Sequence, residues 1–80
     1  MKARVFVTLK PSVLDPQGRT IADALHSMGY AGVADVRQGK FFELEVDAAN
    51  GDDARKLVSD VADKLLANPV IESYRVEIAS

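Results

Sequence analysis

The chain contains no cysteine and no tryptophan, and only one histidine occurs among its 80 residues. The absence of cysteine excludes disulfides and thiolate metal sites, and a lone histidine argues against a zinc site. A domain of this size buries a thin core and usually depends on disulfides, a metal or a partner subunit for its stability. Because the first two are missing, we expect another polypeptide chain to supply the remaining stability.

Neither sign of charge dominates the sequence, since ten basic and twelve acidic residues give a net charge of −2. This balance provides no general attraction to nucleic acid and no polybasic membrane signal. The longest apolar run is far shorter than a membrane-spanning helix, and the first residues are too polar for a signal peptide. We therefore expect one globular, cytoplasmic domain over residues 1–80, with 48% hydrophobic residues.

The first half of the chain begins with a strand pattern and continues with a helix pattern. Residues 3–10 alternate between apolar and polar side chains, which predicts a half-buried strand. Asp15 is a good N-cap and Pro16 a good first helical residue, and the apolar spacing that follows predicts a helix over residues 16–28. The apolar stripe of this helix consists of Ile21, Ala24, Leu25 and Met28.

Two glycines mark the ends of that helix. Gly29 suits the left-handed backbone position that often follows a helix end. Gly18, inside the first turn, costs about 1 kcal/mol relative to alanine. Either the first turn frays or another backbone segment passes close to Gly18, and the sequence leaves both alternatives open.

Within residues 33–48 a polar break separates two groups of apolar residues that all have even numbers. These residues are Ala34, Val36, Phe42, Leu44 and Val46. A two-residue hairpin at the break would scramble the apolar face and is rejected. A three-residue loop would pair Val36 with Phe42 and keep the face, as would one long strand that bends at Gly39. We favour the long bent strand, because a three-residue loop needs glycine at its last position and Gly39 is in the middle.

The remainder of the chain predicts a second helix and a last strand. Asn50 or Asp52 caps a helix over residues 52–67, which Pro69 ends because it displaces the preceding residue from helical geometry. The apolar stripe of this helix consists of Ala54, Leu57, Val58, Val61 and Leu65. In the final strand Tyr74, Val76 and Ile78 share one face.

These elements predict an α+β fold with the order β-α-β(long, bent)-α-β, in which two helices cover one face of an antiparallel sheet. The layout is that of a ferredoxin-like sandwich whose middle hairpin is pulled straight. A straight middle strand leaves each half of the sandwich without its complement, and a second copy could supply it by strand exchange. We therefore predict a dimer or a higher even oligomer.

No set of side chains in the sequence forms a recognisable catalytic site. His26 has no visible acid–base partner and is interpreted as a solvated residue near a helix end. Glu43 and Glu45 share a strand face, which is more typical of a solvated face than of a metal site, and as neighbours of Phe41 they disfavour RNA binding. The dispersed glycines form no phosphate-binding loop. We expect no catalytic residue, bound cofactor or metal in this chain.

Arg37 and Lys40 flank the bend of the middle strand and form the most distinctive charged group on the surface. Such a pair can dock an acidic surface of a partner protein. It can equally be a solvated turn, and the sequence does not decide between the two.

Five segments of the chain, taken together, resemble the PurS family. They are Val5–Lys10, Leu14–Gly18, Ala24–Gly29, Val36–Lys40 and Leu65–Tyr74, and their order and spacing extend over essentially the whole sequence. One departure is Ser73, where an acidic or amide residue is common in the family. Each segment is weak alone, but five in the right order are specific.

The resemblance implies a small subunit of phosphoribosylformylglycinamidine synthase, in organisms that build this enzyme of purine biosynthesis from separate chains. The complex converts formylglycinamide ribonucleotide to the amidine with ATP, magnesium and glutamine. A glutaminase subunit, PurQ, releases ammonia, and a synthetase subunit, PurL, consumes it. The resemblance further implies that PurS dimers bridge these two subunits, assist ammonia transfer, contribute no catalytic residue and bind no cofactor.

For such a bridge, we expect the partner contacts to come from exposed polar residues at the junctions and at the bend. These candidate interface residues are Asp15, Gln17, Arg37, Gln38, Lys40 and Asn68. An alternative function is that of a regulatory module that binds a small molecule, since ferredoxin-like dimers often hold amino acids between subunits. A rise in melting temperature with a free amino acid or nucleotide would favour this alternative.

Overall fold

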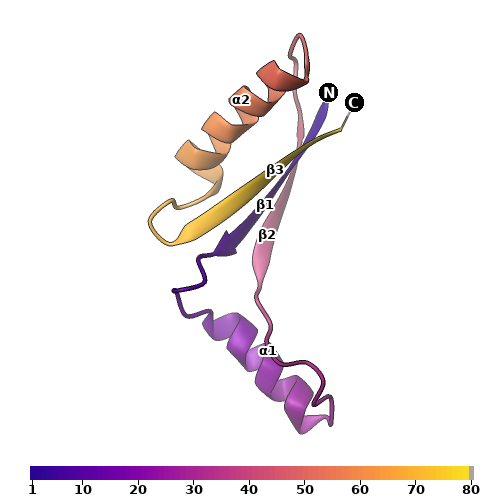
Figure 1. Ribbon diagram of the computed structural model, residues 1–80, viewed down its shortest axis with the longest axis vertical. Helices are drawn as coiled ribbons and strands as arrows, with labels where there is room; N and C mark the ends of the chain where they lie inside the picture. The colour runs from indigo at the N-terminus through magenta and orange to yellow at the C-terminus, as the bar shows by residue number, and fades with distance from the viewer. Residues whose placement is uncertain (80) are drawn as a thin grey trace.

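The computed structural model describes residues 1–79 and shows a three-stranded antiparallel sheet with two helices (Figure 1). The elements are β1 (Lys2–Leu9), α1 (Pro16–Ser27), β2 (Gly39–Glu45), α2 (Gly51–Val61), its π-helical continuation η1 (Ala62–Leu66) and β3 (Glu72–Ala79). The strand order is β2-β1-β3, and both neighbours pair antiparallel with β1. The predicted α+β element order is confirmed.

The core lies between the sheet and α2. Val5 and Val7 of β1 and Val58 of α2 are the largest fully buried side chains, and each contributes about 1.5–3 kcal/mol by leaving water. Alanines fill the remaining central positions, which lets the helix approach the sheet closely. The buried members of this core are Ala3, Val5, Val7, Val46, Ala54, Val58, Ala62 and Ala67. The alternation predicted for the first strand is therefore confirmed.

The first helix, which we expected on the same face as the second, lies instead beyond the end of its own sheet (Figure 1). The chain is accordingly elongated, with extents of 50 × 26 × 14 Å. The buried positions of α1 are Gly18 and Ala22, whereas Ile21 is 40% and Met28 is 69% exposed. The side of α1 that carries the small residues Gly18 and Ala22 is thus buried within the chain, whereas the larger apolar residues Ile21 and Met28 are exposed.

The middle of the chain does not fold back on itself. From the end of α1 it returns to the sheet and enters β2 directly, so the hairpin alternative is excluded (Figure 1). The ladder with β1 begins at Gly39, opposite Thr8, and ends at Glu45. Of the expected long strand over residues 33–48, residues 33–38 therefore have no strand partner within residues 1–79.

The helix starts show the expected caps. The Asp15 carboxylate accepts a hydrogen bond from the Gly18 amide at 2.9 Å. The Asn50 side chain accepts one from the Asp53 amide at 2.9 Å, which identifies Asn50 as the cap of α2. Gly29 has a φ of 93°, as predicted for the residue after the helix end.

The structure also decides between the two alternatives for Gly18. A Cβ atom at this position would lie 2.1 Å from the carbonyl oxygen of Val36, because the returning chain crosses the first turn of α1 there. Glycine is therefore present because two backbone segments touch, and not because the turn frays.

Replacement of Gly18 by alanine should push the crossing chain away from α1. We expect the free energy of unfolding to fall by about 1–3 kcal/mol, as for other overpacked contacts. Gly32→Ala is a matched control, because nothing lies within 4 Å of its Cβ position. Urea unfolding of both variants provides the comparison, and equal stabilities would contradict the close contact.

Candidate functional site

The candidate site is the joint, which we define as residues 10–18 and 35–40 together with the turn at residues 68–72. Here the chain leaves the sheet for α1 and returns to it. Four of the six predicted interface residues line one small cavity at the joint, of about 200 Å³. The cavity is lined by Leu9, Asp15, Gln17, Gln38, Gly39, Lys40 and Glu72.

Asp15 holds the two passages of the chain together. One carboxylate oxygen accepts the amide of Gly18 at 2.9 Å, and the other accepts the amide of Gln38 at 2.7 Å. These hydrogen bonds, first from Gly18 and then from Gln38, keep the pKa of the Asp15 carboxyl below its ordinary value. Asp15 is only 6% exposed, so it supports the joint from inside. The expectation that Asp15 is an exposed surface residue is therefore wrong.

Arg37 forms a second tie across the same joint. Its guanidinium donates hydrogen bonds to the carbonyl oxygens of Val13 at 2.7 Å and Pro11 at 3.0 Å. Both acceptors belong to the connection between β1 and α1, and the rigid fork of arginine suits such a double contact. Arg37 therefore fixes the direction in which α1 leaves the sheet, and its charge is engaged within the chain.

Lys40 and Asn68 meet at a residue that the sequence analysis did not select. Glu72 lies 3.8 Å from the Lys40 ammonium through one carboxylate oxygen and accepts the Asn68 amide at 2.7 Å through the other. The Glu72 side chain is 13% exposed, whereas Lys40 is 60% exposed. A carboxylate at the first position of the last strand was the available signal, but only the fold shows that it faces Lys40.

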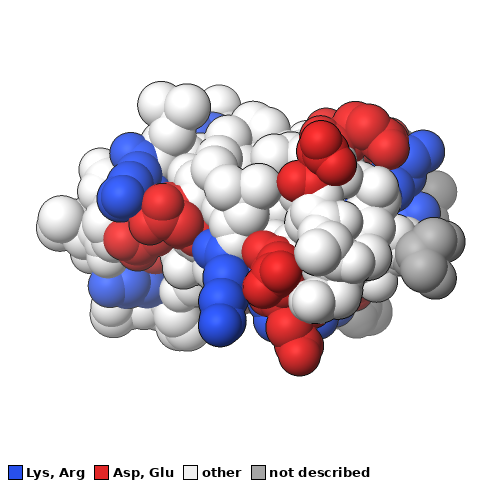
Figure 2. Space-filling view, turned by 90° about the horizontal axis from the view of Figure 1, so that it is seen from above, with Lys and Arg blue, Asp and Glu red and all other residues white. Residues whose placement is uncertain are grey.

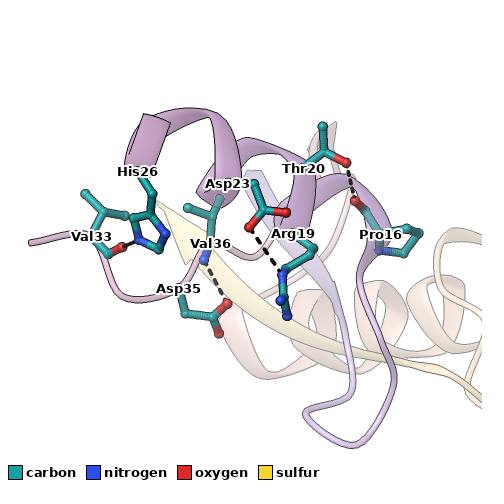
Figure 3. A network of polar contacts seen from close by, with 8 residues as sticks. All are labelled: Pro16, Arg19, Thr20, Asp23, His26, Val33, Asp35 and Val36. Atoms are coloured by element: carbon teal, nitrogen blue, oxygen red, sulfur yellow. Dashed lines mark hydrogen bonds and ion pairs between the residues drawn. The ribbon is translucent and has the colours of Figure 1, made fainter. Parts of the chain in front are cut away.

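The first helix and the loop that follows it form one unit, which we call the arm (residues 16–38). Figure 3 shows its polar contacts. The His26 ring lies 2.6 Å from the carbonyl oxygen of Val33 and ties the loop to the helix, while Arg19 and Asp23 pair at 3.4 Å along α1. His26 is exposed near the helix end, as expected, and its ring also holds the loop.

Exposed charge gathers in no single-sign field on the face that Figure 2 shows, where acidic and basic side chains are interspersed. Within residues 1–79, no group of three or more histidine, cysteine or acidic side chains is placed to hold a metal ion. None of the described helices is long and apolar enough to cross a membrane. The joint therefore combines a rigid interior with exposed polar groups at Gln17, Gln38 and Lys40, an arrangement suited to binding another protein surface.

Comparison with known proteins identifies the relatives of this chain. The family model described as PurS, phosphoribosylformylglycinamidine (FGAM) synthase, matches residues 2–80. A subunit PurS of phosphoribosylformylglycinamidine synthase from Bacillus subtilis is 52% identical over 77 residues, which cover 96% of this chain and 90% of the relative.

Solved structures agree with the sequence comparison. PurS from Methanocaldococcus jannaschii superposes with a TM-score of 0.88 at 37% identity, over 99% of this chain and 95% of that one. A chain in the structure of PurLQS from Thermotoga maritima superposes with a TM-score of 0.87 at 37% identity, over 95% of this chain and 93% of that one.

The hydrogen bonds of Asp15 in the joint predict that the stability of the protein depends on pH. Asp15→Asn removes the charge that accepts two backbone amides, so the variant should melt at a lower temperature than the wild type at neutral pH. Because the folded state lowers the pKa of Asp15, its stabilisation is complete above the ordinary value of 3.8 and is lost as pH falls through the lowered value. The difference in melting temperature should therefore close in acid.

Thermal melts of both proteins from neutral pH to pH about 2 test this prediction. Asp23→Asn is the control, since that carboxylate is exposed on the same helix and should matter little at neutral pH. A gap that stays constant down to the acid end would show that the charge of Asp15 is not what holds the joint.

Proposed function

Because the chain belongs to the PurS family of phosphoribosylformylglycinamidine synthase subunits, we propose that it is a non-catalytic subunit that joins a PurQ-type glutaminase to a PurL-type synthetase in purine biosynthesis. The match to the family over residues 2–80 carries this proposal. The relation to a chain of the T. maritima PurLQS structure supports the choice of partners. ATP, magnesium and glutamine then act on the other subunits.

A bridge of this kind serves ammonia transfer by geometry alone. Free ammonia in water is protonated or lost by diffusion, so two active sites that exchange it must be held close and shielded from solvent. A bridging chain needs a fixed shape more than it needs reactive groups. The joint, with Asp15 and Arg37 engaged within the chain, supports such a fixed shape.

We further propose that the working unit contains a second copy, which completes the sheet along the free edge of β2. Met1 and Val46 exchange hydrogen bonds at 2.7 and 2.9 Å, so even-numbered residues of β2 direct their main-chain groups toward β1. Odd-numbered residues then face the free edge, where residues 33–38 of a second copy can add as a strand. Val36 would lie opposite Phe42 of the second copy, which keeps the apolar side chains on one face.

The two helices support the same arrangement. In the single chain, Leu57 of α2 is 48% exposed, and the stripe of α1 that contains Ile21 and Met28 is also uncovered. When residues 33–38 of one copy pair with β2 of the other, α1 is carried over that sheet, beside α2. Both apolar stripes are then buried together, which stabilises the pair by about 25 cal/mol per Å² of apolar surface removed from water.

Ile21→Glu tests the dimer. A carboxylate buried in the apolar contact between helices should weaken dimer formation by about 100-fold or more, measured by size-exclusion chromatography with light scattering over a dilution series. Asp23→Gln, a change on the polar side of the same helix, should leave dimer formation unchanged. A wild-type protein that remains a stable, solitary monomer at every concentration would contradict the proposed dimer.

Lys40→Glu tests the bridge in the reconstituted complex of all subunits. Lys40 is 60% exposed at the rim of the joint, where it pairs with Glu72 at 3.8 Å, a contact separate from the hydrogen bonds of Asp15 and Arg37. Its reversal gives up this partly exposed pair, and a melting temperature close to that of the wild type shows that the fold survives the change. We expect glutamine-dependent synthesis to fall by about tenfold or more. Ammonia-dependent synthesis should survive, because it bypasses the glutaminase.

Lys2→Glu is the matched control, since Lys2 is 53% exposed, pairs with Glu43 at 3.9 Å and lies at the opposite end of β1 from the joint. It should leave both activities unchanged. If Lys40→Glu supports glutamine-dependent turnover at the wild-type rate, the joint is not the surface that recruits the partners.

A further inference from the structure

Within residues 1–79 no strand pairs with the outer edge of β3, and the direction of each main-chain group along this edge can be assigned. The Lys10 amide donates to the Ile71 carbonyl at 2.8 Å, which continues the ladder with β1, while Arg55 donates to the Val76 carbonyl at 3.1 Å from the other side. Because alternate residues of a strand direct their main-chain groups to opposite edges, the groups of Tyr74, Val76 and Ile78 all face outward.

This edge is distinct from the edge of β2 that the proposed dimer uses, because β1 lies between the two strands. Completion of the dimer therefore leaves β3 at the border of the sheet. An open edge strand presents unsatisfied donors and acceptors and readily pairs with another strand. The sequence of β3 determines which strand fits.

We propose that β3 pairs antiparallel with β3 of another copy, about a two-fold axis that passes through Val76, and so joins two dimers. In this register Val76 lies opposite its own equivalent and Tyr74 lies opposite Ile78 of the other copy. These are the residues whose main-chain groups face outward, so every hydrogen-bonded pair is matched by symmetry. On the inner face, this pairing sets apolar side chains against one another.

The opposite face of the strand is matched in charge. In the same register Arg75 lies opposite Glu77 of the other copy, and the two-fold axis repeats this cross-strand ion pair. An axis at Arg75 or at Glu77 would instead bring like charges together. An axis at Tyr74 would place Val76 opposite Glu72, so only the axis at Val76 satisfies both faces.

Arg55 covers part of this edge of the sheet. Its guanidinium donates a hydrogen bond to the Val76 carbonyl, at the centre of the proposed pairing. This hydrogen bond must break before another strand can pair there. Charged side chains that cover strand edges are a common protection against unwanted pairing. The strength of the association between dimers is therefore set by competition between Arg55 and the incoming strand.

Sedimentation equilibrium of charge variants tests the proposal. Arg75→Glu places like charges opposite each other twice per interface and should weaken association of dimers by about tenfold or more. In the single chain Arg75 is 65% exposed, pairs with Glu77 of its own strand at 2.7 Å and lies 4.4 Å from the centre of the Phe6 ring. A melting curve of the variant therefore accompanies the measurement, to show that the fold tolerates the change. The double variant Arg75→Glu with Glu77→Arg restores both pairs and should restore association.

Two further variants sharpen the comparison. Arg55→Ala frees the Val76 carbonyl and should strengthen association, whereas a nonspecific disruption of the surface would weaken it. Arg19→Glu reverses an exposed charge on α1, beyond the end of the sheet, and should leave association unchanged.

Cysteine cross-linking tests the register itself, since the natural chain has no cysteine. Chains with Arg75→Cys, mixed with chains that carry Glu77→Cys, should form an intermolecular disulfide. The two positions form a non-hydrogen-bonded pair, with Cα atoms about 4.5 Å apart, which a disulfide can span. Either variant alone should cross-link much more slowly, because its equivalent positions are about 7–8 Å apart on the diagonal.

The proposal is overturned if Arg75→Glu and the double variant associate like the wild type, or if the mixed chains cross-link no faster than each alone. It is also overturned if the wild type shows no species above the dimer at any concentration. These outcomes leave the dimer at β2 untouched, because Ile21→Glu reports on that interface separately.

Discussion

The contact on which the structure depends is the ionised Asp15 carboxylate, which bridges the amides of Gly18 and Gln38. This one side chain caps α1 and binds the passage that returns from it. Two charge-assisted hydrogen bonds from opposite directions leave the carboxylate little freedom. The direction of the arm is therefore set by the interior of the joint, with Arg37 as a second tie.

An arm held away from its own sheet creates an imbalance in the packing of the chain. The core between the sheet and α2 is thin, while Ile21 and Met28 in the apolar stripe of α1 remain exposed. A single copy thus leaves apolar surface in water that association with a second copy could bury. This exposed apolar surface favours association, in agreement with the sequence, which has no cysteine and a single histidine to supply other stabilisation.

The same features connect the structure to its proposed role. Membership of the PurS family makes the chain a subunit of a multi-subunit synthase, and in the proposed role it contributes there by position. Rigid ties inside the joint, an exposed rim around Lys40 and free strand edges are properties of a scaffold. In the proposed assembly the two edges differ, because β2 would pair with residues 33–38 of a second copy, whereas at β3 Arg55 donates a hydrogen bond to the Val76 carbonyl.

The sequence alone determined the order of the elements, because period-two and helical apolar spacing, Asp15 with Pro16 and Asn50 are local signals that survive in any tertiary context. It also located the joint, since the predicted interface residues do gather there. Only the tertiary structure decided that Asp15 is buried, that Glu72 faces Lys40, and that α1 leaves its own sheet. Those properties depend on which distant backbone segment passes nearby, as Val36 passes Gly18, and no local pattern encodes that distance.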